Sequence, residues 1–381
     1  MARIGLTDFR GYARLRLDLD PRPVVLTGPN GAGKTNLLEA VSFLVPGRGL
    51  RRARLAEVGR RDPGAAAGRP WAVAATVATP DGPVDIGTGL EATEEADDDG
   101  AGRRAVRIDG VARRGQAALA DVVSALWLTP EMDRLFTESA GARRRFLDRM
   151  VYGFDRGHAA RVAAYEHAMR ERARLLREGA GRADPAWLGA LEARMAENGI
   201  AIVAARQALV GRLNTACANG VGPFPAARLS LGGEVEAWLA AGPALAAEDR
   251  LRDRLVAARR EDAESGGAAA GAHKSVLDAH HILKGVPAAQ CSTGEQKALL
   301  VSITLAQARL QAVERGAPPI LLLDEVAAHL DAARRAALYE EIAALGAQAW
   351  MTGTDADAFA PWGAGAQFLR VEDARLTPAR H

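Results

Sequence analysis

The segment GPNGAGKT, from Gly28 to Thr35, limits more than any other feature what this 381-residue chain can fold into. It follows the apolar run PVVLT, typical of a short buried strand, and it opens KTNLLEAVSFL, whose apolar residues recur at helical spacing. A strand, a glycine-rich turn and a helix in this order predict an α/β fold with a phosphate-binding loop. The alternative is an ordinary turn in a chain with 40 glycines. The expected nucleotide contacts are Gly28, Pro29, Asn30, Gly31, Ala32, Gly33, Lys34, Thr35 and Asn36.

Lysine is rare in this chain, which makes the lysine of the loop informative. Only four of the 49 basic residues are lysines, and one of them is Lys34. We expect Lys34 to reach the β- and γ-phosphates and to take part in catalysis, and the hydroxyl of Thr35 to ligate a metal ion. The loop therefore predicts ATP and Mg²⁺ as cofactors.

Two carboxylates follow an apolar run nearer the other end of the chain. PILLLDE ends in Asp324 and Glu325, which is typical of a buried parallel strand that brings acidic side chains to its C-terminal edge. We expect Asp324 to hold Mg²⁺, mostly through water, and Glu325 to orient or deprotonate an attacking water. Alone, such a pair could equally cap a helix. Together with the phosphate loop it predicts nucleotide hydrolysis.

The composition fits a folded chain of two or three domains. It is 48% hydrophobic and 25% charged, and its net charge of +2 does not by itself predict a nucleic-acid partner. Cys217 and Cys291 suit a reducing compartment or simple burial. No run approaches the ~20 apolar residues that cross a bilayer, and the N-terminus has no apolar signal segment. We expect a cytoplasmic protein without a membrane partner.

Strand-like and helical sequence patterns occupy different parts of the chain, and their order predicts its domain organisation. Residues 1–45 and 70–111 hold strand-like runs, with an acidic loop expected at 94–103. From about residue 135 to 220 the chain has helical spacing, which favours two antiparallel helices of a short arm with a turn at 179–184. Residues 220–285 read as a mixed return segment. Residues 290–381 then predict helix, strand, helix, strand and one last strand over AQFLRVEDARL.

A second candidate anion site begins at Cys291, in CSTGEQK. Ser292 and Gly294 open an apolar-rich helix whose N-terminus favours a negative charge, although a capped helix with nothing bound is the alternative. The segment resembles the signature motif of ABC-type ATPases, and Asp331 lies in AAHLD, which resembles the loop at the dimer seam of those proteins. This resemblance implies that Ser292, Gly294 and Asp331 contact the nucleotide held by a second copy of the chain.

Nearly the whole chain resembles the RecF family of bacterial recombination-mediator ATPases. The Pro-Glu pair followed by RRRFLDR is more diagnostic than the general ATPase motifs. The segments that carry the resemblance are LTDFRGY (6–12), GPNGAGKTNLLEA (28–40), PGRGLRRA (46–53), LTPEMDRLFTESAGARRRFLDRMV (128–151), CSTGEQKALL (291–300) and LLLDEVAAHLD (321–331). The resemblance implies a P-loop ABC-type ATPase head of α/β class formed by both chain ends, residues 1–130 and 285–381, with an inserted helical arm and return segment over 131–284.

The same resemblance implies a function in recombinational gap repair and the SOS response. It implies ATP-dependent homodimerisation, slow hydrolysis, binding to DNA at gaps or single-strand–duplex junctions, and action with RecR and RecO in loading RecA. The family's Gly-Pro-His-Arg-Asp-Asp stretch is replaced by GAHKSVLD, which retains His273, Lys274 and Asp278. His273 can be structural or functional. An SMC-like regulatory or defence ATPase whose partner is a protein stays open as the alternative.

Arginine clusters are the candidate DNA contacts, because several of them near a duplex give salt-dependent affinity without sequence preference. They can equally be solvated helix faces or internal ion pairs. The candidates are Arg51, Arg52, Arg54, Arg143, Arg144 and Arg145. Five further arginines lie among acids and are expected to solvate the arm: Arg161, Arg170, Arg172, Arg174 and Arg177. We expect Phe9 and Tyr12 to pack in the first hairpin.

Overall fold

The computed structural model describes residues 1–62, 64, 68–91, 103–179, 184–327 and 330–379. The chain forms two compact units. The first comprises Met1–Asp133, Val221–Phe224 and Thr304–His381, and the second comprises Arg134–Gly220 and Pro225–Ile303. Most of the loop expected at 94–103, and most of the turn expected at 179–184, lie outside the described residues.

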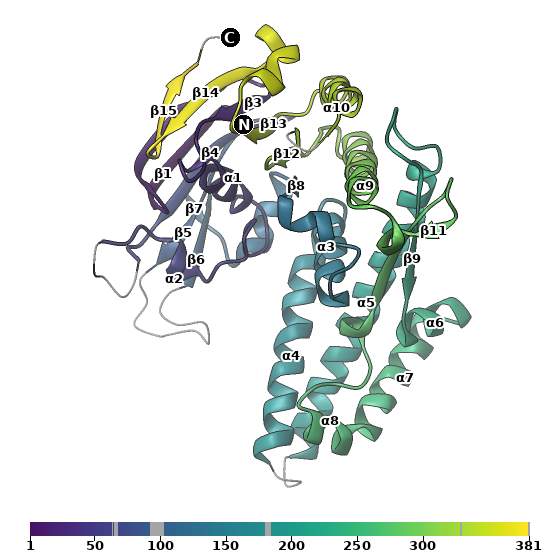
Figure 1. Ribbon diagram of the computed structural model, residues 1–381. Helices are drawn as coiled ribbons and strands as arrows, with labels where there is room; N and C mark the ends of the chain where they lie inside the picture. Colours follow the sequence, from purple (N-terminus) through teal and green to yellow (C-terminus); the bar gives the residue numbers. More distant parts are fainter. Residues whose placement is uncertain (63, 65–67, 92–102, 180–183, 328–329, 380–381) are drawn as a thin grey trace. The chain divides into compact units, whose positions relative to one another are not determined.

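The first unit contains a largely parallel sheet whose strands come from both ends of the chain, as predicted (Figure 1). The strands are β3 (Val24–Thr27), β8 (Ala125–Leu128), β12 (Ile320–Leu323), β13 (Ala349–Gly353), β14 (Gln367–Glu372) and β15 (Arg375–Pro378). Their order is β15-β14-β3-β13-β12-β8. β3, β8, β12 and β13 are buried along their whole length, as expected of short apolar runs covered on both faces.

The prediction of one last strand over AQFLRVEDARL was wrong, because that segment folds back on itself. β14 and β15 are antiparallel, and Glu372 pairs with Arg375. Asp373 and Ala374, between them, have φ angles of 47° and 57°. Two successive left-handed residues make a tight turn whose twist suits a hairpin. The helices of this unit are α1 (Lys34–Ser42), α2 (Leu55–Val58), α10 (Ala332–Leu345) and the C-terminal part of α9 (Thr293–Arg315).

An antiparallel sheet completes the first unit. Its strands are β1 (Arg3–Phe9), β2 (Tyr12–Asp18), β4 (Ala72–Thr79), β5 (Gly82–Glu91), β6 (Arg103–Ile108) and β7 (Val111–Ala112), in the order β2-β1-β4-β5-β6-β7. The strands predicted within 70–111 are therefore confirmed. Alternate residues such as Ile4, Leu6 and Val73 are buried on one face of the sheet, which packs into the core of the unit. Phe9 lies in that core, with its ring 5.5 Å from the ring of Trp71.

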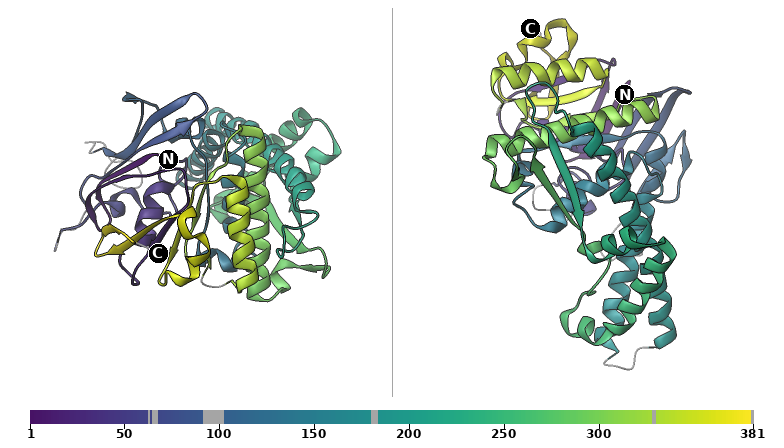
Figure 2. Two further views of the ribbon diagram at one scale, coloured as in Figure 1. Left: turned by 90° about the horizontal axis from the view of Figure 1, so that it is seen from above. Right: turned by 90° about the vertical axis from the view of Figure 1, so that its right-hand side faces the viewer.

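Helices dominate the second unit. They are α3 (Ala140–Tyr152), α4 (His158–Glu178), α5 (Pro185–Cys217), α6 (Glu234–Ala241), α7 (Ala244–Ala257) and α8 (Arg259–Ser265). The strands β9 (Ala227–Gly232), β10 (Val276–His281) and β11 (Val286–Pro287) form a small sheet in the order β11-β10-β9. α4 and α5 pack side by side as the two predicted helices (Figures 1 and 2). Asp184 caps α5, because its carboxylate accepts the N–H of Ala186 at 2.8 Å.

One arginine of the arm contradicts the expectation that these side chains are solvated. Arg172 is 1% exposed, and its guanidinium donates to Asp262 at 2.6 Å and to Glu192 at 3.0 Å. Arg259 also donates to Glu192, at 2.6 Å. A buried arginine needs such partners, since an unpaired charge in the interior is strongly unfavourable. Arg172 therefore joins α4, α5 and α8, whereas Arg170, Arg174 and Arg177 are exposed.

The compact units divide the chain at different residues from the predicted domains. The units change at 133/134 and 303/304, whereas the sequence predicted changes at 130/131 and 284/285. Residues 285–303 belong to the second unit because β11 pairs with β10 there. The assignment of functional domains by the earlier boundaries stays a prediction.

Candidate nucleotide-binding site

The phosphate loop lies at the C-terminal end of β3, between that strand and α1. Gly28 has a φ of 146°, and a Cβ there would clash with the carbonyl oxygen of Val371 in β14. Gly33 has a φ of 111°, a left-handed conformation that glycine adopts without strain, and it precedes the first residue of α1. Glycine is thus required at both ends of the loop. The first-turn N–H groups of α1 consequently face the same end of the sheet as the loop.

Lys34 lies folded onto the loop that it is expected to serve. Its ammonium donates to the carbonyl oxygens of Gly28 at 2.6 Å and Pro29 at 2.9 Å. The residue is 5% exposed, and burial lowers the pKa of Lys34, while the carboxylates of Glu325 and Asp324 oppose that shift. The ammonium therefore lies against the backbone of the loop.

The structure brings the predicted metal ligands together from two distant segments. The Thr35 hydroxyl donates to Asp324 Oδ1 at 3.1 Å, and the Thr352 hydroxyl donates to the same oxygen at 2.7 Å. Thr35 is the second residue of α1, which follows β3, and Asp324 follows β12. Thr352 lies in β13, the strand between β3 and β12 in the sheet. A hydroxyl and a carboxylate oxygen at this distance suit the oxygen preference of Mg²⁺. The side chains present thus fit the expected ion.

Glu325 has an unusual backbone conformation at the edge of the same site. Its φ is 53°, which is uncommon for a residue other than glycine, and its N–H donates to Thr352 Oγ1 at 2.9 Å. Thr352 therefore holds both acidic residues, one through its donor and one through its acceptor. No role for Thr352 was predicted from the sequence. A hydroxyl inside a fully buried strand, which needs a polar partner, was the signal that could have identified it.

A hollow of about 160 Å³ lies against the loop. It is lined by Asn30, Gly31, Gly33, Lys34, Thr35, Asn36, Arg51 and Glu325. Arg51, proposed from sequence as a DNA contact, donates to Asn36 Oδ1 at 2.7 Å. The fully buried carboxylate of Glu39 accepts from Arg10 at 2.7 Å and from Arg51 at 3.4 Å. Glu39 was missed by the sequence, although a carboxylate on the apolar face of α1 is itself a sign that it has cationic partners.

Tyr12 is buried in the first hairpin, as expected, and it contacts the phosphate loop from there. It is 1% exposed, and its hydroxyl donates to the carbonyl oxygen of Gly33 at 3.1 Å. Burial raises the pKa of Tyr12 well above its usual range, so the phenol stays protonated and remains a donor.

The N-terminus of α9 carries the signature residues in the second unit. Ser292, Thr293 and Gly294 are exposed, and no atom would lie within 4 Å of a Cβ added at Gly294. The N–H of Ser292 donates to the carboxylate of Glu295 at 3.0 Å, an arrangement typical of a helix start. Glu295 is also paired with Lys284, and this pairing lowers the pKa of Glu295 to about 2. The helix start is therefore ordered by local contacts and open on its outer side.

Asp331 is the first residue before α10. Its side chain accepts the N–H of Arg334 at 2.8 Å, so that it caps the helix, and it is exposed. Two of the residues before it, 328 and 329, lie outside the described part of the chain. The role of Asp331 toward a second nucleotide stays a prediction.

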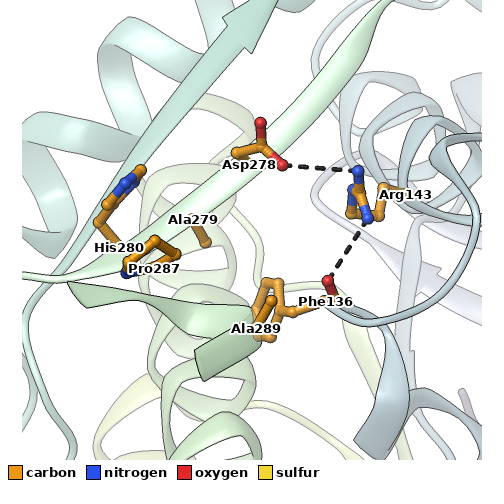
Figure 3. A pocket seen from close by; sticks show the side chains of 7 residues that line it. All are labelled: Phe136, Arg143, Asp278, Ala279, His280, Pro287 and Ala289. Atoms are coloured by element: carbon orange, nitrogen blue, oxygen red, sulfur yellow. Dashed lines mark hydrogen bonds and ion pairs between the residues drawn. The ribbon is translucent and has the colours of Figure 1, made fainter. Parts of the chain in front are cut away.

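Two of the three arginines proposed as DNA contacts in α3 are engaged inside the second unit. Arg143 donates to the carbonyl oxygen of Phe136 at 3.4 Å and lies 3.5 Å from Asp278 (Figure 3). Arg144 donates to the carbonyl oxygen of Ser275 at 2.8 Å. Arg145 is exposed. Internal pairing was the alternative weighed for this cluster, and it accounts for Arg143 and Arg144.

The other proposed DNA contacts lie near α2. Arg52 and Arg54 are exposed, and the carbonyl oxygen of Arg54 accepts the N–H of Glu57 at 2.8 Å at the start of that helix. Exposure alone does not show that Arg52 and Arg54 contact nucleic acid, so that role stays a prediction.

His273 has two partners that a neutral ring satisfies together. Its Nδ1 lies 2.7 Å from the Tyr165 hydroxyl, and its Nε2 lies 2.8 Å from the carbonyl oxygen of Ala268. With the proton on Nε2, the ring donates to Ala268 and accepts from Tyr165. Burial lowers the pKa of His273, which favours this neutral form. The contacts support the structural interpretation.

Comparison with known proteins decides the family. A family model described as RecF/RecN/SMC N terminal domain matches residues 1–361. The DNA replication and repair protein RecF of Mesorhizobium japonicum is 49% identical over 381 residues, which cover 99% of this chain and 97% of that protein. The RecF protein of Caulobacter vibrioides is 50% identical over 379 residues, covering 98% and 96%. The chain belongs to the RecF family.

Solved structures agree with the RecF fold. The structure of the recombination mediator protein RecF-ATPrS in the RecFOR pathway aligns with a TM-score of 0.82 and 19% identity, covering 99% of this chain and 97% of that chain. An Smc head domain with a coiled coil and joint, from Pyrococcus yayanosii, aligns with a TM-score of 0.55 and 15% identity, covering 99% and 96%. These structures confirm the predicted head fold, and the family match makes the chain an ABC-type ATPase of the RecF family.

No helix within the described part of this RecF-family chain is both long and apolar enough to cross a bilayer. Cys217 and Cys291 are buried free thiols, and burial raises the pKa of each.

Proposed function

We propose that the chain is an ATP-dependent, dimerising DNA-binding ATPase of recombinational gap repair. The observation that carries this proposal is the convergence of Lys34 and Thr35 with Asp324 and Glu325 at one end of the parallel sheet. The loop would cradle the phosphates of ATP, with Lys34 on the β- and γ-phosphates. Thr35 and Asp324 would hold Mg²⁺, which neutralises phosphate charge when it is bound.

Glu325 is the residue that we assign to water activation. Its position in the hollow beside Lys34 and Thr35 supports this assignment. The carboxylate would accept a proton from water as the water oxygen bonds to the γ-phosphorus. The bond between that phosphorus and the β–γ bridging oxygen breaks, which leaves ADP and phosphate. We expect slow turnover, as the resemblance to RecF implies.

Dimerisation follows from the second cradle. Ser292 and Gly294 are exposed at a helix start, where N–H groups and the helix dipole favour an anion. We propose that they contact the γ-phosphate of ATP bound by a second copy, together with Asp331. A ligand that contacts both copies binds the dimer better than the monomer and so shifts the equilibrium toward the dimer. Hydrolysis removes the bridging phosphate and releases the pair.

The repair pathway is the part of the proposal carried by family membership. Relatives that are 49–50% identical are named DNA replication and repair protein RecF, and a solved relative is named for the RecFOR pathway. We propose DNA gaps or single-strand–duplex junctions as the target, and RecR, RecO and RecA as pathway partners, in the cytoplasm. The competing hypothesis is an ATPase of the same fold that acts on a protein.

Sedimentation of the Glu325→Gln variant with ATP and Mg²⁺ tests the proposal. The variant removes the proposed base and should accumulate as an ATP-bound dimer. The experiment is run with and without a gapped duplex at two salt concentrations, and with Glu264→Gln, an exposed carboxylate of α8, as the matched control. A dimer that carries DNA and loses it as salt rises supports the proposal. A dimer that ignores DNA at both salt concentrations favours the protein-directed ATPase.

A further inference from the structure

The outer face of the antiparallel sheet carries arginines on both sides of a floor of small residues. The strand register gives one row across five strands: Arg16, Gly5, Ala74, Gly87 and Arg107. The next row, two residues along each strand, begins with Arg14 and continues through Thr7, Ala72, Gly89 and Ala105. Side chains in these rows point away from the core, because their neighbours along each strand are the buried ones.

The arginines of this face are exposed and available. The side chains of Arg14, Arg16 and Arg107 have no hydrogen bond or salt bridge with any described residue. Arg104, on the opposite face of β6, shows the contrast, because it is turned inward and donates to the carbonyl oxygens of Phe43 and Gly47. Pairing inside the fold therefore does not explain the three outward arginines.

Acidic residues of this face lie in the rows on either side of the two arginine rows, with Glu91, opposite Arg103, at one end and Asp18 and Asp85 at the other. Asp18 pairs with Arg3 at 2.7 Å, and Asp85 accepts the Thr76 hydroxyl at 2.6 Å. These four residues form the row next to Arg16, on the side away from Arg14. The Arg14 and Arg16 rows themselves contain three arginines and no acidic residue.

Two glycines of the floor are not required by the sheet itself. Gly5 and Gly87 lack a left-handed φ, and a Cβ added at either would meet only one carbonyl oxygen, at 3.8 Å. Glycine weakens a strand interior, and where the fold does not need it, it marks a place that another chain or ligand approaches closely. A hollow of about 400 Å³ lies over this part of the sheet, and its lining includes Arg3, Arg14, Arg16 and Asp85.

We propose that this sheet face binds double-stranded DNA through its phosphate backbone, without reading base sequence. The proposal deepens the proposed function, on which it rests, by naming the surface. Arg16 and Arg107 lie four strand spacings apart, about 19 Å at ~4.8 Å per spacing, which exceeds the ~12 Å width of a major groove. Arginines on both borders can therefore reach phosphates on the two sides of one groove. The small residues between them let the duplex approach the strands.

The test compares two triple variants that remove the same charge. Arg14→Ala, Arg16→Ala and Arg107→Ala together alter the sheet face, whereas Arg170→Ala, Arg174→Ala and Arg177→Ala together alter exposed arginines of α4. Binding of a labelled 30-base-pair duplex is measured by fluorescence anisotropy over a salt series, with ATP and Mg²⁺. We expect the sheet variant to lose at least about tenfold in affinity and its log–log salt slope to fall by about 2 to 3. The α4 variant should match the wild type.

Folding and the nature of the partner are checked in parallel. Thermal unfolding and ATP hydrolysis of the sheet variant should equal those of the wild type, because its three side chains are exposed and lie outside the nucleotide site. Gly87→Val provides a second probe: it should weaken DNA binding by filling the floor, while unfolding stays at or above the wild-type temperature. Polyglutamate serves as a probe for an acidic protein partner.

The outcomes separate the surface from the proposed function. Salt-dependent DNA binding by the wild type that is unchanged in the sheet variant overturns the surface and leaves the function standing. Loss of polyglutamate binding with DNA binding intact assigns the face to an acidic protein and also overturns it. A wild type that binds no duplex at any salt concentration overturns both.

Discussion

The two anion cradles of this chain differ in how complete they are. The phosphate loop is enclosed by its own unit: Lys34 is 5% exposed, Thr35 contacts Asp324, and Tyr12 supports the loop from behind. The signature helix start is exposed, and Gly294 has open space where a side chain would be. The first cradle has a positive side chain, a metal-ligand pair and a candidate base, whereas the second offers a hydroxyl and backbone N–H groups.

This difference indicates that the two cradles have different roles toward a nucleotide. A cradle with its own cation and carboxylates can bind and hydrolyse a nucleotide's phosphates. An open helix start with a carboxylate already held by Lys284 can add contacts to an anion that is presented to it. The comparison therefore predicts that substitutions in the first cradle impair nucleotide binding, and that substitutions in the second impair association of two copies.

The largest effect is expected from Lys34→Ala. The substitution removes an ammonium that would make charge-assisted hydrogen bonds to phosphate, each contributing about 1.5–3 kcal/mol. ATP affinity should therefore fall at least about 100-fold. Equilibrium binding of a fluorescent ATP analogue measures this effect, with Lys274→Ala as a control at an exposed lysine of the second unit. Wild-type affinity in Lys34→Ala would remove the basis for assigning the first cradle to ATP.

A smaller and more selective effect is expected from Ser292→Arg. The longer side chain displaces the hydroxyl from an exposed helix start without touching the phosphate loop's own contacts. ATP binding by the monomer should stay within about twofold of the wild type, while the dimer dissociation constant rises about 30-fold for a loss of ~2 kcal/mol.

Analytical ultracentrifugation with ATP and Mg²⁺ measures the dimer of Ser292→Arg. Ser265→Arg, at the exposed end of α8, is the matched control, since it adds the same side chain elsewhere in the second unit. An ATP-driven dimer of normal stability in Ser292→Arg would contradict the assignment of the second cradle to a partner's nucleotide.

The candidate site shows what the sequence could and could not predict. Glycine spacing, one scarce lysine and a strand ending in two carboxylates are local patterns, and they predicted Lys34 and Thr35 after one buried strand and Asp324 after another. In the structure Thr35 and Asp324 meet although β13 lies between those two strands. Thr352 and Glu39 were missed because their roles depend on partners far away in the sequence. A hydroxyl in a buried strand and a carboxylate on the apolar face of a helix indicate that a polar partner is needed, but neither signal identifies that partner.

Surface arginines were the least predictable feature. Sequence clusters favoured Arg143 and Arg144, whose partners are a carbonyl oxygen or carboxylate from distant segments. Arg16 and Arg107 lie 91 positions apart in the numbering and share a row only because the strands between them are in register. The expectation that Arg172 is solvated was wrong for the same reason, since its buried partners come from α5 and α8. Charge clusters along the chain therefore do not identify charge clusters on the surface.

The smallest effect, from Thr352→Val, tests whether the first cradle depends on its support. Valine keeps the shape but removes the donor to Asp324 and the acceptor for the Glu325 N–H. A lost hydrogen bond contributes about 1 kcal/mol, so hydrolysis should fall about fivefold with ATP affinity nearly unchanged. Steady-state hydrolysis over a range of Mg²⁺ concentrations measures both the rate and the metal requirement. Thr352→Ser, which retains the hydroxyl, should restore the wild-type rate. Equal rates for the valine and serine variants would show that the strand ends alone position Asp324 and Glu325. The parallel sheet, and not the Thr352 hydroxyl, would then determine the geometry of the first cradle.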